Sequence, residues 1–370
     1  MSGATEPDWL NFDVHGVLGV RIHPDAPATQ ALRTLMEAFA VGRAVPGDIV
    51  LAPGLDPMID AAVVGDDLAY NATSIHFRRH HVQVVVDGTE FRVNGPGDVF
   101  SALMPLLDVA MVIRETAMVH TASLGYRGCA IALPGPAGAE TAEVATGLSG
   151  RPGFSLMGGE WGFVTADGRL LGHDKPVVAE RPDRRSPRRT LSGAALRAQA
   201  LPGLRGPVRR LTTALAPHLG NHPTWGDVPL RRPADDRTVP PRPDETGTLD
   251  APLLMAVFVE RYEGARSHVA ERDTAWMVQR LVGNCSLAMP TVSRSVLEGM
   301  AATSHLSLGC FFEEKAAVLV RALAEVPLFV LQVPSVYSSS VVSEEVVRVV
   351  EDLLRSLVDA GKAPSGVSVA

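Results

Sequence analysis

The stretch Ala130–Gly147 (AIALPGPAGAETAEVATG) constrains the fold of this chain more than any other. Its first four residues are apolar and predict a short buried strand. The Gly/Pro-rich segment Pro134–Ala139 predicts a turn, and a helix is expected from about Glu140 to Leu148. A strand, a glycine-rich turn and a helix in this order form the layout in which backbone N–H groups at a helix N-terminus bind phosphate.

The residues that would bind a triphosphate in such a loop are replaced. The complete pattern is G-x-x-x-x-G-K-[ST], and the window that begins at Gly135 reads G-P-A-G-A-E-T-A. Glu140 therefore stands in the position of the second glycine, Thr141 in that of the lysine, and Ala142 in that of the magnesium-binding hydroxyl. The remaining N–H groups of the turn predict either an anion site or a turn without a ligand. The candidate binding residues of this loop are Gly135, Pro136, Ala137, Gly138, Ala139, Glu140, Thr141 and Ala142.

The composition is that of an ordinary soluble globular protein, with 46% apolar and 20% charged residues over 370 positions. This length predicts about two domains. The net charge of −7 favours neither nucleic acid nor an anionic membrane as a partner. The segment Arg181–Arg210 departs from this average, because it holds nine arginines and one acid, Asp183. It contains no aromatic residues, so we interpret it as a cover for a phosphate, a binding segment for an acidic partner, or a solvated loop.

The three cysteines are widely spaced and form no metal-binding pattern, so we expect reduced, buried thiols and no metal site. They are Cys129, Cys285 and Cys310. The N-terminal sequence MSGATEPDWLNFD is acidic and contains no apolar signal, and no uninterrupted apolar run reaches the about 18 residues of a membrane span. We therefore expect a cytoplasmic protein with no membrane partner.

Residues 1–96 predict a small, mostly antiparallel N-terminal α/β module. Its expected elements are strands at Val14–Ile22, Ala69–His76 and His81–Val86, a helix at Thr29–Phe39, and a hairpin turn at Asp87-Gly88 before Thr89–Val93. Residues 97–370 predict a second α/β domain around the glycine-rich loop, with an Arg/Pro-rich mobile insert at about 178–248. Its expected helices are Val99–Met118, Ala270–Leu281, Val292–Thr303, Glu314–Glu325 and Ser343–Leu357, and its further strands are Val119–Leu124, Phe154–Val164, Arg169–Leu171, Leu253–Val259 and Leu328–Gln332.

The order of the parts around the loop is specific enough to compare with a known group. A histidine lies in the strand Val119–Ser123, the loop segment Arg127–Gly138 follows, and the segment Gly158–Trp161 then carries one acid before a tryptophan. Arg169–His173 and Val326–Leu331 come later in the same order. The chain resembles the HPr-kinase/phosphoenolpyruvate-carboxykinase-like group of P-loop proteins over about residues 12–357, most closely over 114–178.

The resemblance implies a P-loop domain with a mixed central sheet. In this group the loop lysine binds phosphates, a hydroxyl and an acidic pair bind Mg²⁺, and a hydroxyl of a protein or small molecule is phosphorylated. The first acid of the pair is Gly159 here, so Glu160 alone remains of the pair and His120 remains of the upstream strand. Each lost donor of this type costs about 3 kcal/mol or more in the transition state, so efficient transfer from ATP is not expected.

Two residues are the candidate catalytic groups. His120 is interpreted as a general base or substrate contact, and the alternative is a strand histidine hydrogen-bonded to the backbone. Glu160 is expected to face the loop, with Trp161 pointing away by strand alternation, and the alternative is an ordinary carboxylate at a strand end.

Two further clusters have weaker functional interpretations. In His76-Phe77-Arg78-Arg79-His80-His81, strand alternation predicts that His76, Arg78 and His80 share one face. A metal site there lacks a third ligand, so a solvated or partner-facing edge strand is favoured. Asn284-Cys285-Ser286, and His305 with Cys310, resemble catalytic pairs, but buried thiols are the commoner case.

Two functions follow as hypotheses. The first is an HPr-kinase-like protein that has lost phosphotransfer and binds a small molecule, a peptide or a carrier protein, as a partner of a biosynthetic enzyme or as an enzyme repurposed around His120 and Glu160. It needs no cofactor, and association of the chain with itself is expected by analogy. The second is a kinase of a small-molecule or peptide hydroxyl that uses ATP and Mg²⁺, with arginines in place of the lysine.

Overall fold

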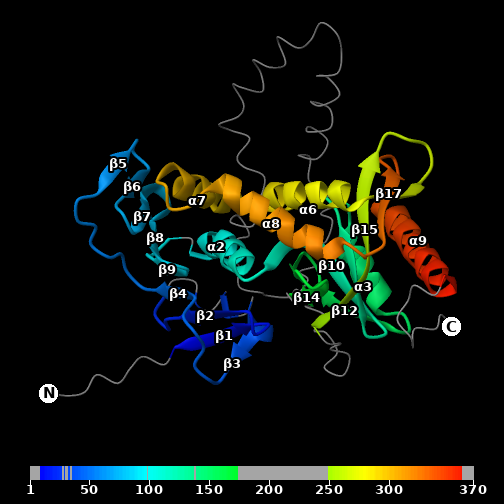
Figure 1. Ribbon diagram of the computed structural model, residues 1–370, viewed down its shortest axis with the longest axis horizontal. Helices are drawn as coiled ribbons and strands as arrows, with labels where there is room; N and C mark the ends of the chain where they lie inside the picture. The colour runs from blue at the N-terminus through cyan, green and yellow to red at the C-terminus, as the bar shows by residue number, and fades with distance from the viewer. Residues whose placement is uncertain are drawn as a thin grey trace, which may run out of the picture. The chain divides into compact units, whose positions relative to one another are not determined.

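Two mixed β-sheets and the helices packed on them make up this α/β chain (Figure 1). The computed structural model describes residues 9–26, 29, 32–33, 36–97, 99–136, 139–173 and 249–360. All of these belong to one compact unit that combines Met1–Pro176 with Val239–Ala370. The expected α/β class is confirmed. The Arg/Pro-rich insert, including Arg181–Arg210, lies outside the described residues.

The first sheet is built from residues 10–94 and has nine strands in the order β3-β1-β2-β4-β9-β8-β7-β6-β5. Most pairs are antiparallel, as expected, but β2–β4 and β4–β9 are parallel. The strands are β1 (Leu10–Val14), β2 (Leu18–Ile22), β3 (Ala40–Val41), β4 (Ile49–Ala52), β5 (Ala62–Val64), β6 (Leu68–Tyr70), β7 (Ser74–Phe77), β8 (Val82–Asp87) and β9 (Glu90–Asn94).

Several predicted elements of this sheet were wrong in extent. Val14–Ile22 is not one strand, because His15 and Gly16 adopt positive φ angles and turn β1 back into β2. The hairpin after Asp87 is present, with Asp87 paired to Glu90. The predicted helix Thr29–Phe39 is seen only in part, since several of its positions lie outside the described residues, and Glu37–Phe39 forms a 3-10 turn (η1).

The second sheet has eight strands and is organised by two long ones. The first half of β10 pairs with β13, and its second half pairs with β11 on one side and β12 on the other. Strand β15 pairs antiparallel with β14 and then runs parallel to β11 and β17. The strands are β10 (Thr116–Tyr126), β11 (Cys129–Pro134), β12 (Phe154–Gly158), β13 (Trp161–Thr165), β14 (Arg169–Gly172), β15 (Asp250–Tyr262), β16 (His268–Glu271) and β17 (Leu328–Pro334).

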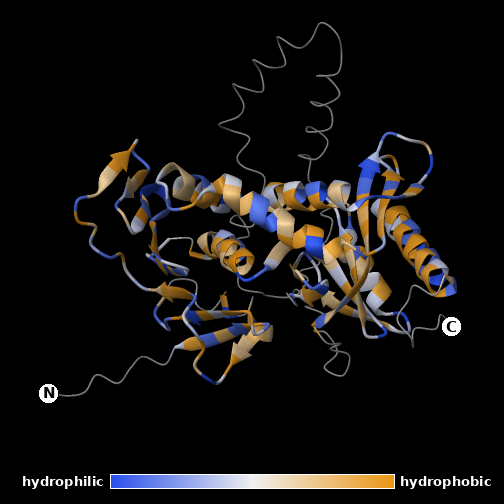
Figure 2. Cartoon of the chain, viewed as in Figure 1, coloured by the Kyte–Doolittle hydropathy of each residue, from blue (hydrophilic) through white to orange (hydrophobic). Residues whose placement is uncertain are grey.

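Helices cover both faces of this sheet because its central strands are apolar on both sides. Ile131 and Leu133 of β11 pack in a core with α3 and α9, whereas Ala130 and Ala132 pack in a second core with α6 and α8. Helix α9 shows an apolar stripe toward the sheet and a polar outer face (Figure 2). The helices are α2 (Val99–Ile113), α3 (Thr141–Ser149), α6 (Thr274–Ala288), α7 (Thr291–Ala302), α8 (Leu308–Leu323) and α9 (Ser339–Asp359).

Four helix predictions needed correction at their ends, and the first is Ser343–Leu357, because α9 begins at Ser339. Helix α2 ends at Ile113 rather than Met118, because Thr116 already begins the long strand β10. Ala270 lies in β16, and α6 begins only after Asp273, whose carboxylate accepts a hydrogen bond from the Trp276 N–H. Helix α8 starts at Leu308, six residues before the predicted start, where Ser307 caps it.

Helix α2 connects the two sheets, since it contacts β4, β8 and β9 of the first and β10 of the second. It is apolar nearly all round, as expected for a buried helix (Figure 2).

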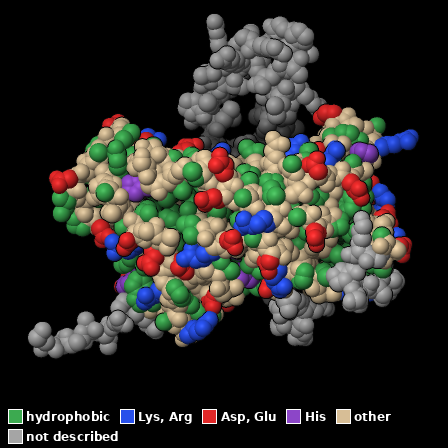
Figure 3. Space-filling model, viewed as in Figure 1, with side chains coloured by type: hydrophobic (Ala, Val, Ile, Leu, Met, Phe, Trp, Pro, Cys, Tyr) green, Lys and Arg blue, Asp and Glu red, His purple; other side chains and the backbone are tan. Residues whose placement is uncertain are grey.

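At the far edge of the first sheet, the short strand β5 leaves Val63 and Val64 exposed beside Ile59, in a region of the surface where hydrophobic side chains are visible (Figure 3). Among the helices of the described residues, none is both long and apolar enough to cross a membrane.

Candidate functional site

The candidate site lies where three parallel strands of the second sheet end. Strands β11, β15 and β17 run parallel as β11–β15–β17, so their carboxyl ends share one edge of the sheet. The loop Gly135–Glu140 leaves β11 at this edge, and α3 begins at Thr141. Crevices outside the carboxyl ends of parallel strands are the usual ligand sites of open α/β sheets. The expected strand–turn–helix arrangement is therefore present.

Gly135 is required here by crowding rather than by a ligand. A Cβ atom added to this buried residue would lie 2.7 Å from the Val259 carbonyl oxygen and 2.8 Å from the Ala139 Cβ. The next contact would be the Thr141 side chain at 3.2 Å. The glycine that opens the loop is thus explained by close packing against β15, whether or not an anion binds.

Glu140 has the most unusual conformation among the described residues of the loop. Its φ of 52° lies in the left-handed region, which glycine adopts without strain. Its carboxylate accepts hydrogen bonds from the Arg261 Nη2 at 3.0 Å and from the Ser339 Oγ at 3.0 Å. The expected excess of negative charge at the loop is therefore compensated by a partly buried ion pair.

Arg261, near the end of β15, fixes the surroundings of the loop. Besides Glu140, its guanidinium donates to the backbone oxygens of Pro334 at 3.2 Å and Tyr337 at 2.9 Å. Pro334 is the last residue of β17, and Tyr337 lies between β17 and α9. One side chain therefore joins the start of α3 to the ends of β15 and β17 at the shared edge of the sheet.

His120 lies beside the loop, as expected. It is the residue of β10 at which pairing changes from β13 to β11, so it adjoins the end of β11. Its Nδ1 is 3.3 Å from the Gly135 carbonyl oxygen. The Asn284 Nδ2 of α6 donates to that oxygen at 2.9 Å and to the His120 carbonyl oxygen at 3.2 Å, and it lies 3.3 Å from Nδ1, so the tautomer decides which ring contact is a hydrogen bond.

Burial lowers the pKa of His120 below its usual value of 6.5, against the opposing effects of Glu160 and the Gly135 carbonyl. The imidazole is therefore neutral at pH 7. A neutral imidazole next to a backbone oxygen can accept a proton, which is the chemistry of a general base. The contacts with the Gly135 carbonyl and Asn284 also provide the hydrogen bonding that a purely structural histidine needs. The structural role was the alternative interpretation of His120.

Glu160 lies in the turn between β12 and β13 rather than on a strand, so the predicted alternation was wrong. Its carbonyl oxygen accepts a hydrogen bond from the Thr121 N–H at 2.9 Å, and its negative charge acts to raise the pKa of His120. Trp161 does not point away from this group, because its ring meets that of His120 edge to face, with 5.1 Å between centroids. His120 and Glu160 are thus brought together, as expected.

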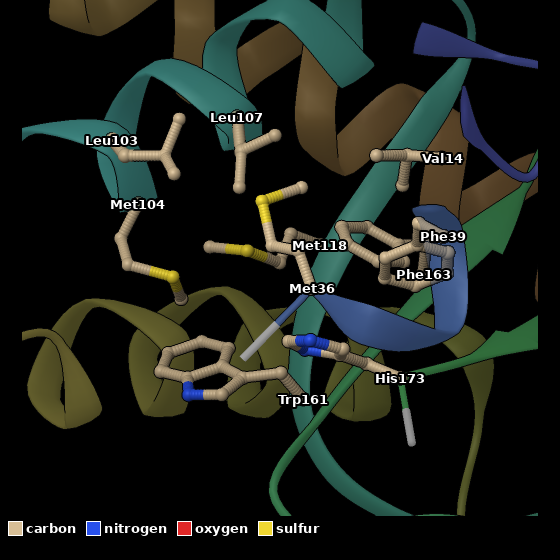
Figure 4. A pocket seen from close by; sticks show the side chains of 10 residues that line it. All are labelled: Val14, Met36, Phe39, Leu103, Met104, Leu107, Met118, Trp161, Phe163 and His173. Carbon is tan, nitrogen blue, oxygen red and sulfur yellow. The ribbon is translucent and has the colours of Figure 1, made fainter. Parts of the chain in front are cut away.

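Trp161 also lines an apolar cavity (Figure 4). Its side chain faces Met104 and Met118 there, and His173 borders the same space (Figure 4). The cavity volume of about 20 Å³ is that of a single water molecule, and its apolar lining offers such a water no partners. This cavity is a packing defect and not a ligand pocket.

The other loop residues are placed unevenly. Ala137 and Gly138 lie outside the described residues. Pro136 is exposed, Ala139 and Thr141 are buried, and Ala142 is half-buried in the first turn of α3. Thr141 fills the position of the lysine with a side chain packed against Gly135, so it presents no charge to a phosphate.

Three residues of the site were missed by sequence reasoning. Arg261, Asn284 and Ser339 come from β15, α6 and α9, which are far from the loop in the sequence. Asn284 was considered only as a neighbour of Cys285. No local pattern marks these residues, because their proximity to the loop depends on strand pairing and helix packing.

The remaining predicted clusters give different outcomes. His76 lies on β7, but Arg78–His80 form a 3-10 turn (η2), so the three side chains do not share a strand face. Cys129 and Cys285 are buried, whereas Cys310 is exposed, contrary to expectation. The His305 Nδ1 lies 2.9 Å from the Thr303 Oγ1. Within the described ranges, no three or more His, Cys, Asp or Glu side chains gather as metal ligands.

Comparison of the sequence with models of known protein families and with curated proteins gave no match.

Proposed function

We propose that this chain is a degenerate HPr-kinase/phosphoenolpyruvate-carboxykinase-like P-loop protein that no longer transfers phosphate from ATP. It binds a small molecule, a peptide or a carrier protein at the edge of the sheet around His120, Glu160 and the Gly135 loop. Two observations support the relation to P-loops. The strand–loop–helix unit leaves the carboxyl end of a parallel strand, and Glu140, in the position of the second glycine, has the positive φ that glycine favours.

The observation that carries the loss of phosphotransfer is the ion pair between Glu140 and Arg261. A carboxylate at the start of α3 adds negative charge to the helix end at which the pattern brings phosphate oxygens, and like charges repel there. Arg261 is the cation beside the loop, and Glu140 with two carbonyl oxygens engages it. Neutral Thr141 supplies no replacement for the lysine.

The test is a thermal-shift titration of the full chain with ATP and Mg²⁺. We expect no saturable rise in Tm at micromolar nucleotide, and such a rise would overturn the proposal. Glu140→Gln removes the carboxylate charge and releases Arg261, so we expect this variant to gain stabilisation by ATP–Mg²⁺ or inorganic pyrophosphate. Glu143→Gln is the matched control, because Glu143 is an exposed acid in the same first turn of α3. Equal behaviour of the two variants would contradict the blocking role of Glu140.

The alternative is an ATP-dependent kinase of a hydroxyl group, with Arg261 in place of the loop lysine. The position of Arg261 beside Glu140 is the observation that favours it. It requires Glu140 to release the guanidinium when nucleotide binds. ADP formation that depends on a candidate substrate, and that falls sharply in Glu160→Gln and Arg261→Ala, would establish this function in place of the first.

A further inference from the structure

A lysine, a cysteine and an aspartate meet in the core, where Cys285 follows the site residue Asn284 on α6. The Lys315 Nζ of α8 is 2.6 Å from the Asp108 Oδ2 of α2 and 3.1 Å from the Cys285 Sγ of α6. The Cys285 Sγ is itself 3.9 Å from the Asp108 Oδ2. The side chains of Lys315 and Asp108 are each only 1% exposed, and Cys285 is equally buried. Neither proposed function uses these three groups.

The choice of lysine at this position is unusual for this chain. The sequence contains three lysines among its 34 basic residues, and Lys315 is the one that the described residues include. Arginine is the better residue for a buried ion pair, because its planar guanidinium makes more hydrogen bonds and stays charged. An amine, unlike a guanidinium, becomes a nucleophile when it loses a proton. The arrangement therefore places a potential nitrogen nucleophile next to a thiol and a carboxylate.

We propose that dioxygen converts Lys315 and Cys285 into a covalent N–O–S cross-link between α8 and α6, with Asp108 as the proton acceptor. One oxygen atom forms bonds to Nζ and Sγ, and the O–O bond breaks. Two N–H bonds and the S–H bond break: one proton passes to the Asp108 carboxylate, and the other two hydrogens leave with the second oxygen atom as water. Nitrogen and sulfur lose two electrons each, and dioxygen gains four.

Three features of the cluster support this chemistry. The Nζ–Sγ distance of 3.1 Å is much longer than one N–S bond, so an inserted oxygen atom needs less movement of the helices than direct bonding. Asp108 lies within reach of both the ammonium and the thiol. Burial raises the pKa of Asp108, so a proton on this carboxyl is favoured once the cross-link has removed the positive charge of Lys315.

Burial also raises the pKa of the Cys285 thiol to about 11, which makes spontaneous attack by the thiolate rare. It thereby protects Cys285 from the usual progression to sulfinic and sulfonic acids, which needs exposed thiolate. Dioxygen is small and uncharged, and local fluctuations admit it to packed cores more readily than larger oxidants. The cross-link is therefore expected to form slowly and at this site only.

The test compares full-length protein purified under argon with reductant and the same protein kept in air-saturated buffer. We expect the air-exposed protein to gain the mass of one oxygen minus two hydrogens. Tryptic digestion is expected to yield residues 281–294 joined to residues 295–321, because trypsin cannot cleave after a modified Lys315. Treatment with a thiol reductant should restore the original mass. These readouts are independent of nucleotide binding, so a failure of this proposal can be distinguished from a failure of the proposed function.

Four variants sharpen the assignment. Cys285→Ser and Lys315→Arg should each abolish the joined peptide. If Lys315→Arg does not fold, Cys285→Ser still gives the test, because it keeps the Lys315–Asp108 pair. Cys129→Ser removes the other buried thiol and Cys310→Ser the exposed one, and both should leave the cross-link in place. Because Cys310 lies within residues 295–321, the joined peptide of Cys310→Ser is lighter by the mass difference between sulfur and oxygen. An unchanged mass in air, an added oxygen at Cys285 without a joined peptide, or a joined peptide that lacks the oxygen would each overturn the proposal.

Discussion

At the scale of single residues, the buried charges of Lys315 and Asp108 depend on each other. Burial alone would lower the pKa of Lys315, but Asp108 and Cys285 outweigh it and raise that pKa, so the lysine keeps its proton. Their direct contact offsets the cost of burying two ions, and removal of one leaves the charge of the other uncompensated. The pair thus links α2 to α8, and the loss of either charge is expected to lower the free energy of unfolding.

Lys315→Met is expected to lower the free energy of unfolding by about 3–5 kcal/mol, because it leaves the Asp108 carboxyl buried and unpaired. Urea unfolding followed by circular dichroism measures this change. The double variant Asp108→Leu/Lys315→Met replaces the pair with apolar side chains and should recover most of the loss. A double variant no more stable than Lys315→Met alone would mean that packing, not charge, accounts for the effect.

His120 gives the stability a pH dependence of known sign. Its pKa is lowered in the folded protein, so between that value and 6.5 the unfolded chain binds more protons than the folded one. The free energy of unfolding should therefore fall as the pH drops below 6.5. We expect His120→Gln to show a shallower fall, measured by urea unfolding at a series of pH values.

Half-buried His15 contributes in the same direction, since burial lowers its pKa against the opposing effects of the Gly172 carbonyl, Asp250 and Asp13. The double variant His15→Gln/His120→Gln should lose more of the pH dependence than either single variant. A slope that stays at the wild-type value in His120→Gln would show that this imidazole titrates as it does in the unfolded chain.

At the scale of elements, two helical glycines differ in the space around them. Gly299 of α7 is buried, and a Cβ atom there would lie 2.5 Å from the Phe77 ring of β7. Gly283 of α6 is exposed and has nothing within 4 Å of such an atom. The close approach of α7 to the first sheet thus depends on the absence of one side chain.

Gly299→Ala is expected to destabilise the protein by about 1–3 kcal/mol, because overpacking against Phe77 exceeds the gain in helix propensity. Gly283→Ala is the matched control and should stabilise by about 0.5–1 kcal/mol. Thermal and urea unfolding of the two variants give the comparison. Stabilisation by both would mean that α7 shifts away from β7 at no cost.

Helix α6 carries both Asn284 and Cys285, and its start depends on Asp273. The Asp273 carboxylate accepts a hydrogen bond from the Trp276 N–H at 2.7 Å. Asp273→Ala should lower the free energy of unfolding by about 1 kcal/mol, while Asp273→Asn keeps the acceptor and should lower it little. Equal losses in both variants, measured by urea unfolding, would assign the effect to the charge at the helix N-terminus instead of the cap.

At the scale of the whole described unit, α2 is shared by both sheets. Leu106 of this helix is fully buried. A helix that contributes to both cores couples their stabilities, so neither sheet can lose α2 without exposing apolar area.

Leu106→Ala should therefore cost about 2–5 kcal/mol and lower the unfolding midpoint of both sheets together. Hydrogen exchange read by mass spectrometry distinguishes peptides of residues 10–94 from those of residues 116–172. Ile113→Ala, at the exposed end of the same helix, is the control and should change little. A loss of protection confined to one sheet would show that α2 does not couple them.

The sequence by itself determined the elements whose cause is local. The apolar strand Ala130–Leu133 and the helix after the loop appear as predicted, because strand burial and helix formation follow from neighbouring residues. His120 also lies beside the loop, as its order along the chain predicted. Local rules failed where the backbone leaves a regular element, as at Glu160 and at Arg78–His80.

Only the tertiary structure decided which side chains act on one another. The contacts Asn284–His120, Arg261–Glu140 and Lys315–Asp108 join residues separated by 164, 121 and 207 positions. No periodicity or motif encodes such pairs, since they arise from the pairing of β11 with β15 and from helices packed on opposite faces of the sheet. Glu140 changes accordingly from an unmatched negative charge in the sequence to the partner of Arg261 in the fold.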